Sequence, residues 1–284
     1  MLCQPPVTFL GVEFERVDIT QALDWVVQQS KADSFSYLVT PNVDHIVQIH
    51  RSDNGDAAQA FEGANFIVCD SRILSLLARV SGLQVPVVPG SDLTRELLVS
   101  LAQGTRIAVV GGDQALLARL ASRYPKYSWM AHYPPMGVRT DPSARQAIAD
   151  FVSASQADIV LFAIGAPQSE LTCREIALQG RARGTALCIG ASLEFLTGAK
   201  KRAPLWMQGL ALEWLFRLLS EPRRLWRRYL VLGPSILVIW WRWRLAANAR
   251  LDAGSASIPS GGLSKSQDKL ESSKPHRSER EPSP

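Results

Sequence analysis

Short apolar runs alternate with longer amphipathic stretches over residues 9–198, and this alternation predicts the fold. The apolar runs, most of them followed by Gly, Pro, Asn or Asp as strands commonly are, lie at 9–14, 37–40, 65–69, 85–88, 106–110, 158–164 and 185–189. Apolar residues recur at helical spacing between them, at 18–31, 93–102 and 169–183. We therefore expect an α/β fold within residues 1–200, a Rossmann-like and mostly parallel sheet with helices on both faces.

Polar and glycine residues gather in the predicted strand-to-helix turns. Ligands of such sheets bind at the carboxyl ends of the strands, so these turns should converge on one pocket. The turns are Thr40–Asn42, Asp70-Ser71, Gly90–Asp92, Gly111-Gly112 and Gly165–Glu170. Ser91 or Asp92 also has the right type and place to cap the helix that follows.

Asp70 is the most informative of these residues because it directly follows a strongly apolar strand. Its carboxylate could accept a proton from an attacking hydroxyl, with Thr40 and Asn42 on the neighbouring turn bonding the same ligand. Asp70 could equally be a helix cap, and Asn42 with Asp44 a turn and a cap. The residues alone leave both interpretations open.

The other motifs carry weaker signals. Gly111-Gly112 is half of a dinucleotide fingerprint, but the full GxGxxG is absent. These glycines either let the backbone approach a phosphate or a ribose closely or simply form a tight turn. His45, His50 and His132 lack metal-ligand or triad spacing and are expected to be surface or core residues. We expect no metal site.

Residues 201–250, here called the appendage, are basic and rich in tryptophan. Eight arginines stand against two acids in 212–250, and six of the eight tryptophans lie between 206 and 243. The pattern predicts one helix over 205–219, a second from Pro222, and a third over 235–250 beyond a break at Gly233-Pro234. The apolar run 229–241 falls short of the roughly 20 residues of a membrane span. The combination of tryptophan and arginine favours helices that lie on an anionic membrane. Arginine-rich helices could also be simply solvent-exposed or could bind nucleic acid.

Composition narrows the class of protein. Of the 284 residues 46% are hydrophobic and 20% charged, enough for a sizeable core. The four cysteines are widely spaced, which predicts reduced thiols in a cytosolic protein rather than a zinc site or a disulfide scaffold. The first residues lack the pattern of a secretory signal. Residues 251–284 are rich in Ser, Gly, Pro, Lys and Glu and predict a disordered tail.

A long ordered run in and before the appendage makes the sequence recognisable. It comprises Gly198, Arg202-Ala203-Pro204, Trp206, residues 212–218, Glu221-Pro222, Arg224 and residues 228–230. With the turns named above, over residues 8–232, it resembles the WecG/TagA/CpsF glycosyltransferase family. Three positions depart from the family pattern: Gln168 stands one residue early, Val87 replaces a common arginine and Glu194 a common aspartate.

The resemblance implies transfer of a hexose, of the N-acetylmannosamine or a related type, from a UDP-sugar to an undecaprenyl-diphosphate-linked acceptor. The transfer would proceed with inversion, without a metal or other cofactor, and serve exopolysaccharide, teichoic acid or surface antigen synthesis. It would take place on the cytoplasmic face of the bacterial inner membrane, with the appendage on the anionic surface and helping to complete the active site. Nucleic acid is not an expected partner, and a homo-oligomer remains open.

The resemblance also assigns roles to residues. Asp70 matches the family's proposed catalytic base, and Thr40 and Asn42 match pocket residues. Further substrate contacts are expected from Gly90, Ser91, Asp92, Gly111, Gly112, Gly165, Gln168, Glu170, Gly190 and Glu194. The charges of the donor and acceptor diphosphates would be neutralised by Arg202, Arg217, Arg224 and Arg228.

Two other classes of protein fit parts of the pattern. A nucleotide-dependent oxidoreductase could use the same fold, although the missing GxGxxG argues against it. A non-catalytic membrane adaptor could use the basic helices alone, but it would not need polar turns at five strand ends.

Overall fold

The computed structural model describes residues 4–51 and 55–255. By its internal contacts the chain divides into two compact units, residues 1–244 and 245–284. The described part of the second unit is the end of a single helix, α13 (Ser235–Ser255). Residues 251–255 of the predicted tail are therefore helical, and residues 256–284 lie outside the described part of the chain.

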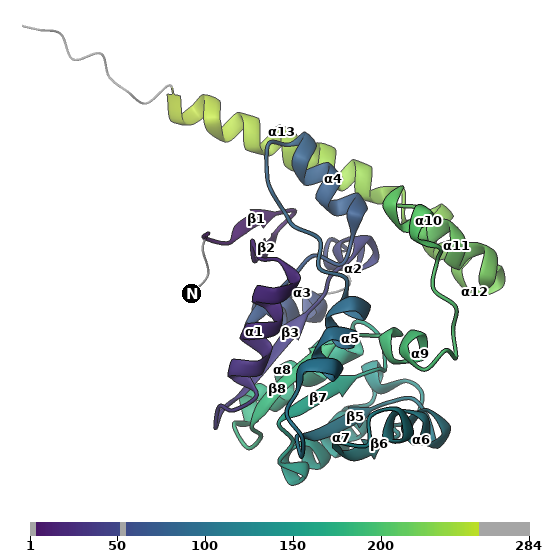
Figure 1. The fold of residues 1–284 in the computed structure, drawn as a ribbon. Helices are drawn as coiled ribbons and strands as arrows, with labels where there is room; N and C mark the ends of the chain where they lie inside the picture. The colour runs from purple at the N-terminus through teal and green to yellow at the C-terminus, as the bar shows by residue number, and fades with distance from the viewer. Residues whose placement is uncertain (1–3, 52–54, 256–284) are drawn as a thin grey trace, which may run out of the picture. The chain divides into compact units, whose positions relative to one another are not determined.

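A six-stranded parallel sheet forms the centre of the first unit in the described residues (Figure 1). The strands lie in the order β4 (Phe66–Ile67), β3 (Phe35–Val39), β8 (Gly184–Cys188), β7 (Ile159–Phe162), β5 (Arg106–Val110) and β6 (Ser128–His132), and each neighbouring pair is parallel. From β3 the chain continues to β4 at one edge of the sheet, and from β5 it continues to β6 at the opposite edge. Strand order thus reverses in the middle of the sheet, where this class of fold opens a cleft.

Successive residues along each strand pack into opposite hydrophobic layers, as the period-2 geometry of a strand requires. In β3, Tyr37 and Val39 belong to one layer and Leu38 to the other. One layer is covered by α2 (Val43–Ile49), α3 (Gly55–Glu62), α4 (Arg72–Val80), α7 (Pro142–Ser155) and α8 (Gln168–Gln179). The other layer is covered by α1 (Ile19–Gln29), α5 (Gly90–Ser100), α6 (Gln114–Arg123) and α9 (Ser192–Leu196). The α/β fold with helices on both faces is confirmed.

Some local predictions were wrong. The apolar run 9–14 is part of an antiparallel hairpin, β1 (Val7–Phe9) and β2 (Val12–Phe14), because Leu10 and Gly11 both turn with positive φ. The run 85–88 makes one isolated bridge, between Cys69 and Val87. The sequence reading also passed over β6, α7 and the 3₁₀ turn η1 (Val138–Thr140). The described cysteines, Cys69, Cys173 and Cys188, are free and buried, as predicted.

The appendage does not begin with one long helix. The predicted helix 205–219 is split into α10 (Leu205–Gly209) and α11 (Glu213–Ser220), because Ala211 takes a left-handed conformation with φ of 59°. The second helix, α12 (Pro222–Trp226), begins at proline as predicted and continues as a π-helical turn, η2 (Arg227–Leu232). These elements and the start of α13 pack with the sheet in one compact unit.

The predicted break at Gly233-Pro234 is the boundary between η2, which ends at Leu232, and α13, which begins at Ser235, but the backbone stays helical there. Gly233 keeps helical angles, and its N–H donates to the carbonyl of Arg228, five residues back, at 2.8 Å. This widened turn lets the helix pass the proline, which has no N–H to give. A Cβ on Gly233 would lie 2.8 Å from the Tyr229 carbonyl oxygen, so the turn needs glycine. By length and composition alone, the helical stretch Pro222–Ala247 could cross a membrane, contrary to our expectation from the sequence.

Candidate active site

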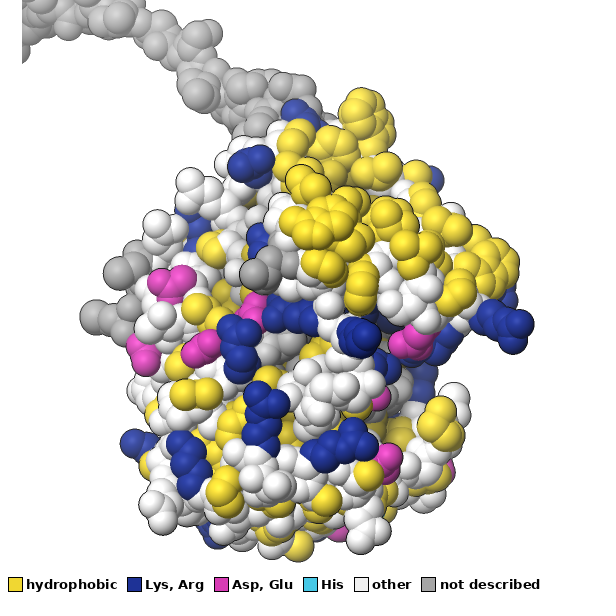
Figure 2. Space-filling model, turned by 45° about the vertical axis from the view of Figure 1, so that its right-hand side comes forward, with side chains coloured by type: hydrophobic (Ala, Val, Ile, Leu, Met, Phe, Trp, Pro, Cys, Tyr) yellow, Lys and Arg dark blue, Asp and Glu magenta, His cyan; other side chains and the backbone are white. Residues whose placement is uncertain are grey.

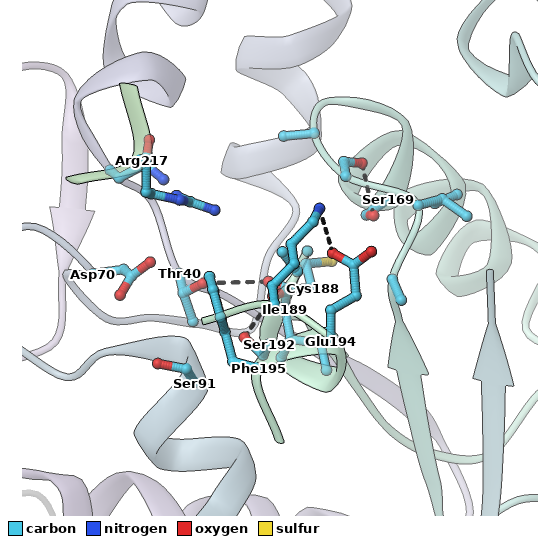
Figure 3. A pocket seen from close by; sticks show the side chains of 18 of the residues that line it. Thr40, Asp70, Ser91, Ser169, Cys188, Ile189, Ser192, Glu194, Phe195 and Arg217 are labelled. Carbon is cyan, nitrogen blue, oxygen red and sulfur yellow. Dashed lines mark hydrogen bonds and ion pairs between the residues drawn. The ribbon is translucent and has the colours of Figure 1, made fainter. Parts of the chain in front are cut away.

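The turns at the carboxyl ends of the strands surround a cavity of about 520 Å³. It is lined by the turns after β3, β4, β5, β7 and β8, by α9, and by appendage residues from α11 to η2. In Figure 3, Asp70, Ser91 and Arg217 lie along one side and Glu194 and Ser169 along the other, with Thr40 between them. The predicted convergence of the turns on one pocket is therefore observed.

Asp70 lies at the β4 end of this cavity and does not cap a helix. The cap of α4 is Ser71, whose hydroxyl accepts from the Leu74 N–H. Asp70 instead accepts a hydrogen bond at Oδ1 from the Gly90 N–H at 3.1 Å, and its own N–H donates to the Pro41 carbonyl. Burial raises the pKa of Asp70 to about 7, against the lowering effect of the Gly90 bond. The result is a carboxyl group poised to exchange a proton near neutral pH.

Charged neighbours act on Asp70 from both parts of the protein. Glu213, at the start of α11, raises the pKa of Asp70, whereas Arg217 of α11 and His45 of α2 lower it. Arg217 places its guanidinium 5.6 Å from the centre of the Phe195 ring. The appendage thus brings both a like charge and an opposite charge to the aspartate.

Thr40 is buried at the end of β3, and its hydroxyl donates to the Cys188 carbonyl at 3.3 Å (Figure 3). A Cβ on Gly90 would lie 3.0 Å from the Thr40 hydroxyl oxygen, so glycine lets α5 begin against this turn. Ser91, one residue further, lines the cavity. Neither Ser91 nor Asp92 caps α5: its N-cap is Pro89, without a side-chain bond.

Asn42, His45 and Glu170 form a connected group on the cavity wall. Asn42 caps α2 by accepting from the Asp44 N–H, so its capping role is real and coexists with its place in the cavity. The Asn42 N–H donates to Nδ1 of His45, and Nε2 of the same ring lies 3.7 Å from Oε1 of Glu170. The other carboxylate oxygen of Glu170, Oε2, is buried and has no hydrogen-bond partner among the described residues. Glu170 can therefore accept a hydrogen bond from a polar ligand.

All four predicted arginines line the cavity. Three of them are held by carboxylates: Arg202 by Asp92, Arg224 by Glu221, and Arg228 by Asp44 at 3.2 Å. The Arg228 Nε is buried without a partner within the described chain. These guanidinium groups give one end of the cavity the positive charge that an anionic ligand requires.

A few predicted residues lie behind the wall rather than on it. Asp92 turns toward Arg202, which holds its pKa below the usual range through a bidentate pair. Gly111 allows the turn after β5 to pack closely against Ile164, because a Cβ at Gly111 would lie 2.7 Å from the Ile164 side chain. Gln168 donates to the Ile164 carbonyl. Gly90 is also outside the lining, which does include the predicted Gly112, Gly165 and Gly190. Glu194 lines the cavity as predicted and pairs with Lys200.

Several lining residues were missed by the sequence reading: Asp44, His45, Asp113, Arg119, Lys200, Lys201 and Glu213. His45 had a usable signal, because it stands three residues after a capping asparagine at a strand end. Glu213 had none, because nothing local relates the start of α11 to the β4 edge. No group of three or more His, Cys, Asp or Glu side chains is arranged to hold a metal within the described residues.

The sequence over residues 7–250 matches the family model described as glycosyl transferase WecG/TagA/CpsF. The chain belongs to this family. Because the match covers the sheet, the cavity and the whole appendage, the oxidoreductase and adaptor interpretations are set aside. This WecG/TagA/CpsF protein is a glycosyltransferase of cell-surface polysaccharide synthesis, and the cavity around Asp70 is its candidate active site.

Proposed function

We propose that the protein is an inverting, metal-independent transferase that moves a hexose of the N-acetylmannosamine or a related type from a UDP-sugar to a polyprenyl-diphosphate-linked saccharide. The observation that carries this proposal is one half-buried carboxyl group with a raised pKa, Asp70, which lines a polar cavity together with guanidinium groups of the appendage. An uncharged sugar hydroxyl needs a base, and a departing diphosphate needs cations.

In the proposed reaction the acceptor hydroxyl attacks the anomeric carbon from the side opposite the diphosphate. The carbon–oxygen bond to the diphosphate breaks, UDP leaves with the bonding electrons, and Asp70 takes the hydroxyl proton. Thr40, Asn42 and the glycine turns position the donor. Arg202, Arg217 and Arg224 stabilise the leaving UDP, and Arg228, which lines the same cavity, helps to bind the acceptor diphosphate.

The side chains exposed on the appendage support the proposal that the protein binds a membrane surface. Large apolar side chains are exposed there, among them Trp206, Trp226 and Trp241. Figure 2 shows a patch of apolar side chains beside lysine and arginine side chains on one face of the molecule. Tryptophan prefers the headgroup region, and basic residues prefer anionic lipid. We propose that the patch rests on the cytoplasmic face of the bacterial plasma membrane, where a lipid-linked acceptor is found.

The direct test replaces the base. Asp70→Asn should lower turnover by about 10² to 10⁴, the usual cost of losing a general base. UDP should still raise the melting temperature of the variant, which shows that the donor side is intact. The wild-type kcat/KM should fall tenfold per pH unit below about pH 7, since only the charged carboxylate accepts the proton. The assay is the mass of the product from a panel of UDP-sugars and a lipid-linked disaccharide, and near wild-type turnover by Asp70→Asn would reject the mechanism.

A further inference from the structure

A second cavity, of about 470 Å³, adjoins the first and has a different character. Its walls are mostly apolar, with side chains from α2, α4, the loop before α5 and the appendage: Val47, Ile73, Val87, Trp214, Ile236 and Leu237. Its volume lies within the roughly 300–1,000 Å³ of typical small-molecule sites. The reaction at Asp70 does not by itself require such a space.

The two cavities meet at the charged residues. Asp70, Glu213, Arg217 and Arg228 belong to the lining of both. A ligand that occupied the two cavities would place an anionic group between Arg217 and Arg228, a polar group near Asp70, and an apolar chain in the second cavity. The shape and charge together thus describe one kind of molecule, an amphiphile with an anionic junction.

The far end of the apolar cavity borders the exposed patch. Leu230 and Leu237 line the cavity and are themselves 56% and 54% exposed. They lie on η2 and α13, close in sequence to the exposed Val231, Leu232 and Val238. An apolar chain that leaves the cavity at Leu230 and Leu237 would therefore meet exposed apolar side chains, of the kind that gather on the face shown in Figure 2.

We propose that this cavity holds the isoprene units next to the diphosphate of the acceptor lipid. The inference rests on the proposed function for the identity of the diphosphate. A single cavity suits a single chain, whereas a phospholipid brings two. Binding the first units inside the protein draws the diphosphate out of the headgroup region and fixes the attached sugar beside Asp70. The rest of the chain remains in the membrane.

The first experiment measures how affinity depends on chain length in the full-length wild-type protein. The probes are inorganic diphosphate and the dimethylallyl, geranyl and farnesyl diphosphates, compared by titration calorimetry. Each isoprene unit that enters the cavity should tighten binding by about tenfold or more, because it removes apolar surface from water. Equal affinity for inorganic diphosphate and for all three prenyl diphosphates would overturn the inference.

The second experiment fills the cavity. Ile73 is half-buried on α4, so Ile73→Trp should occupy the space, and Val87→Trp fills it from another element if the first variant fails to fold. The gain with chain length should fall to less than about twofold per unit, with inorganic diphosphate bound as in the wild type. The matched control is Leu76→Trp on the same helix, which is 48% exposed and outside the lining, and should behave as the wild type.

The outcomes separate the two proposals. A folded Ile73→Trp or Val87→Trp protein that keeps the full dependence on chain length would refute the cavity as the prenyl site. A normal dependence on chain length, with no sugar transferred from any UDP-sugar to a long-chain acceptor, would leave the prenyl site intact and overturn the proposed function instead.

Discussion

The raised pKa of Asp70 predicts that the proposed catalytic base destabilises the folded protein. In the folded state its pKa is about 7, against an ordinary value of 3.8 that the unfolded chain should show. Between these values the folded state binds the proton and the unfolded state does not. Stability therefore falls as pH rises from about 4 to 7, and below pH 4 both states are protonated and the effect vanishes.

The size of the effect follows from the shift. About three pKa units correspond to about 4 kcal/mol at pH 8, an upper value because a real cavity admits water. Asp70→Asn removes the charge and keeps the shape, and the Asn carbonyl oxygen can still accept from the Gly90 N–H. The variant should therefore be more stable than the wild type by up to about 4 kcal/mol at pH 8, and equal to it near pH 4.

Urea unfolding followed by tryptophan fluorescence at several pH values measures both proteins. Glu213→Gln is a useful third protein: it removes a negative charge that raises the pKa of Asp70, so the fall in stability should occur at lower pH. A lower stability of Asp70→Asn at pH 8, or a difference that does not change with pH, would refute the reasoning. The same measurements show whether lost turnover in the variant comes from chemistry rather than from unfolding.

Two further predictions concern the appendage. Arg202→Lys should lower the free energy of unfolding by about 1–3 kcal/mol, because lysine cannot replace the bidentate, part-buried pair with Asp92. Arg95 forms an exposed pair with the same aspartate, so Arg95→Lys should lower the free energy of unfolding by under about 0.5 kcal/mol. Comparable losses for the two variants in urea titrations would contradict this prediction. Replacing both Trp226 and Trp241 by Ser should weaken sedimentation with anionic vesicles on the order of tenfold. Leu178→Ser on α8, at a side chain even more exposed than the two tryptophans, should leave sedimentation unchanged. Wild-type sedimentation by the double variant would argue against the patch.

The parts of the fold that the sequence predicted well are those with a strong local pattern. The strands β5, β7 and β8 are largely apolar because both faces of the sheet are covered, and a glycine follows each of them within three residues. The edge strand β6 was missed because its side chains are only half-buried or exposed, so Ser128 and His132 weaken the apolar signal. The break at Ala211 was missed because a left-handed alanine is set by packing and not by residue type.

The candidate site likewise contains residues that a local sequence pattern predicts and residues that it does not. Thr40, Asp70 and the turn glycines could be predicted because the carboxyl ends of parallel strands must meet. The pairings Arg202–Asp92 and Arg228–Asp44 join residues more than 100 positions apart, and no local pattern reports them. The apolar cavity could not be predicted from the sequence for a related reason. Val87 and Ile73 have the pattern of ordinary core residues, and only their position next to the appendage makes them part of a cavity wall.

The contribution of the appendage to the proton acceptor links membrane attachment to the proposed chemistry. A carboxyl group with a pKa of about 7 is close to half charged at neutral pH, so a modest change in its surroundings changes the fraction able to act as a base. Two of the charges that set this fraction, Glu213 and Arg217, belong to α11, in the same appendage that carries the exposed tryptophans. Displacing the appendage removes the opposing effects of Glu213 and Arg217 together and also opens the site to water, which lowers the pKa of Asp70 toward its ordinary value. Under the proposed function, a protein detached from the membrane would gain charge on Asp70 while losing the arginine proposed to neutralise the leaving diphosphate, and we therefore expect acceptor-free hydrolysis of the donor to be slow in that state.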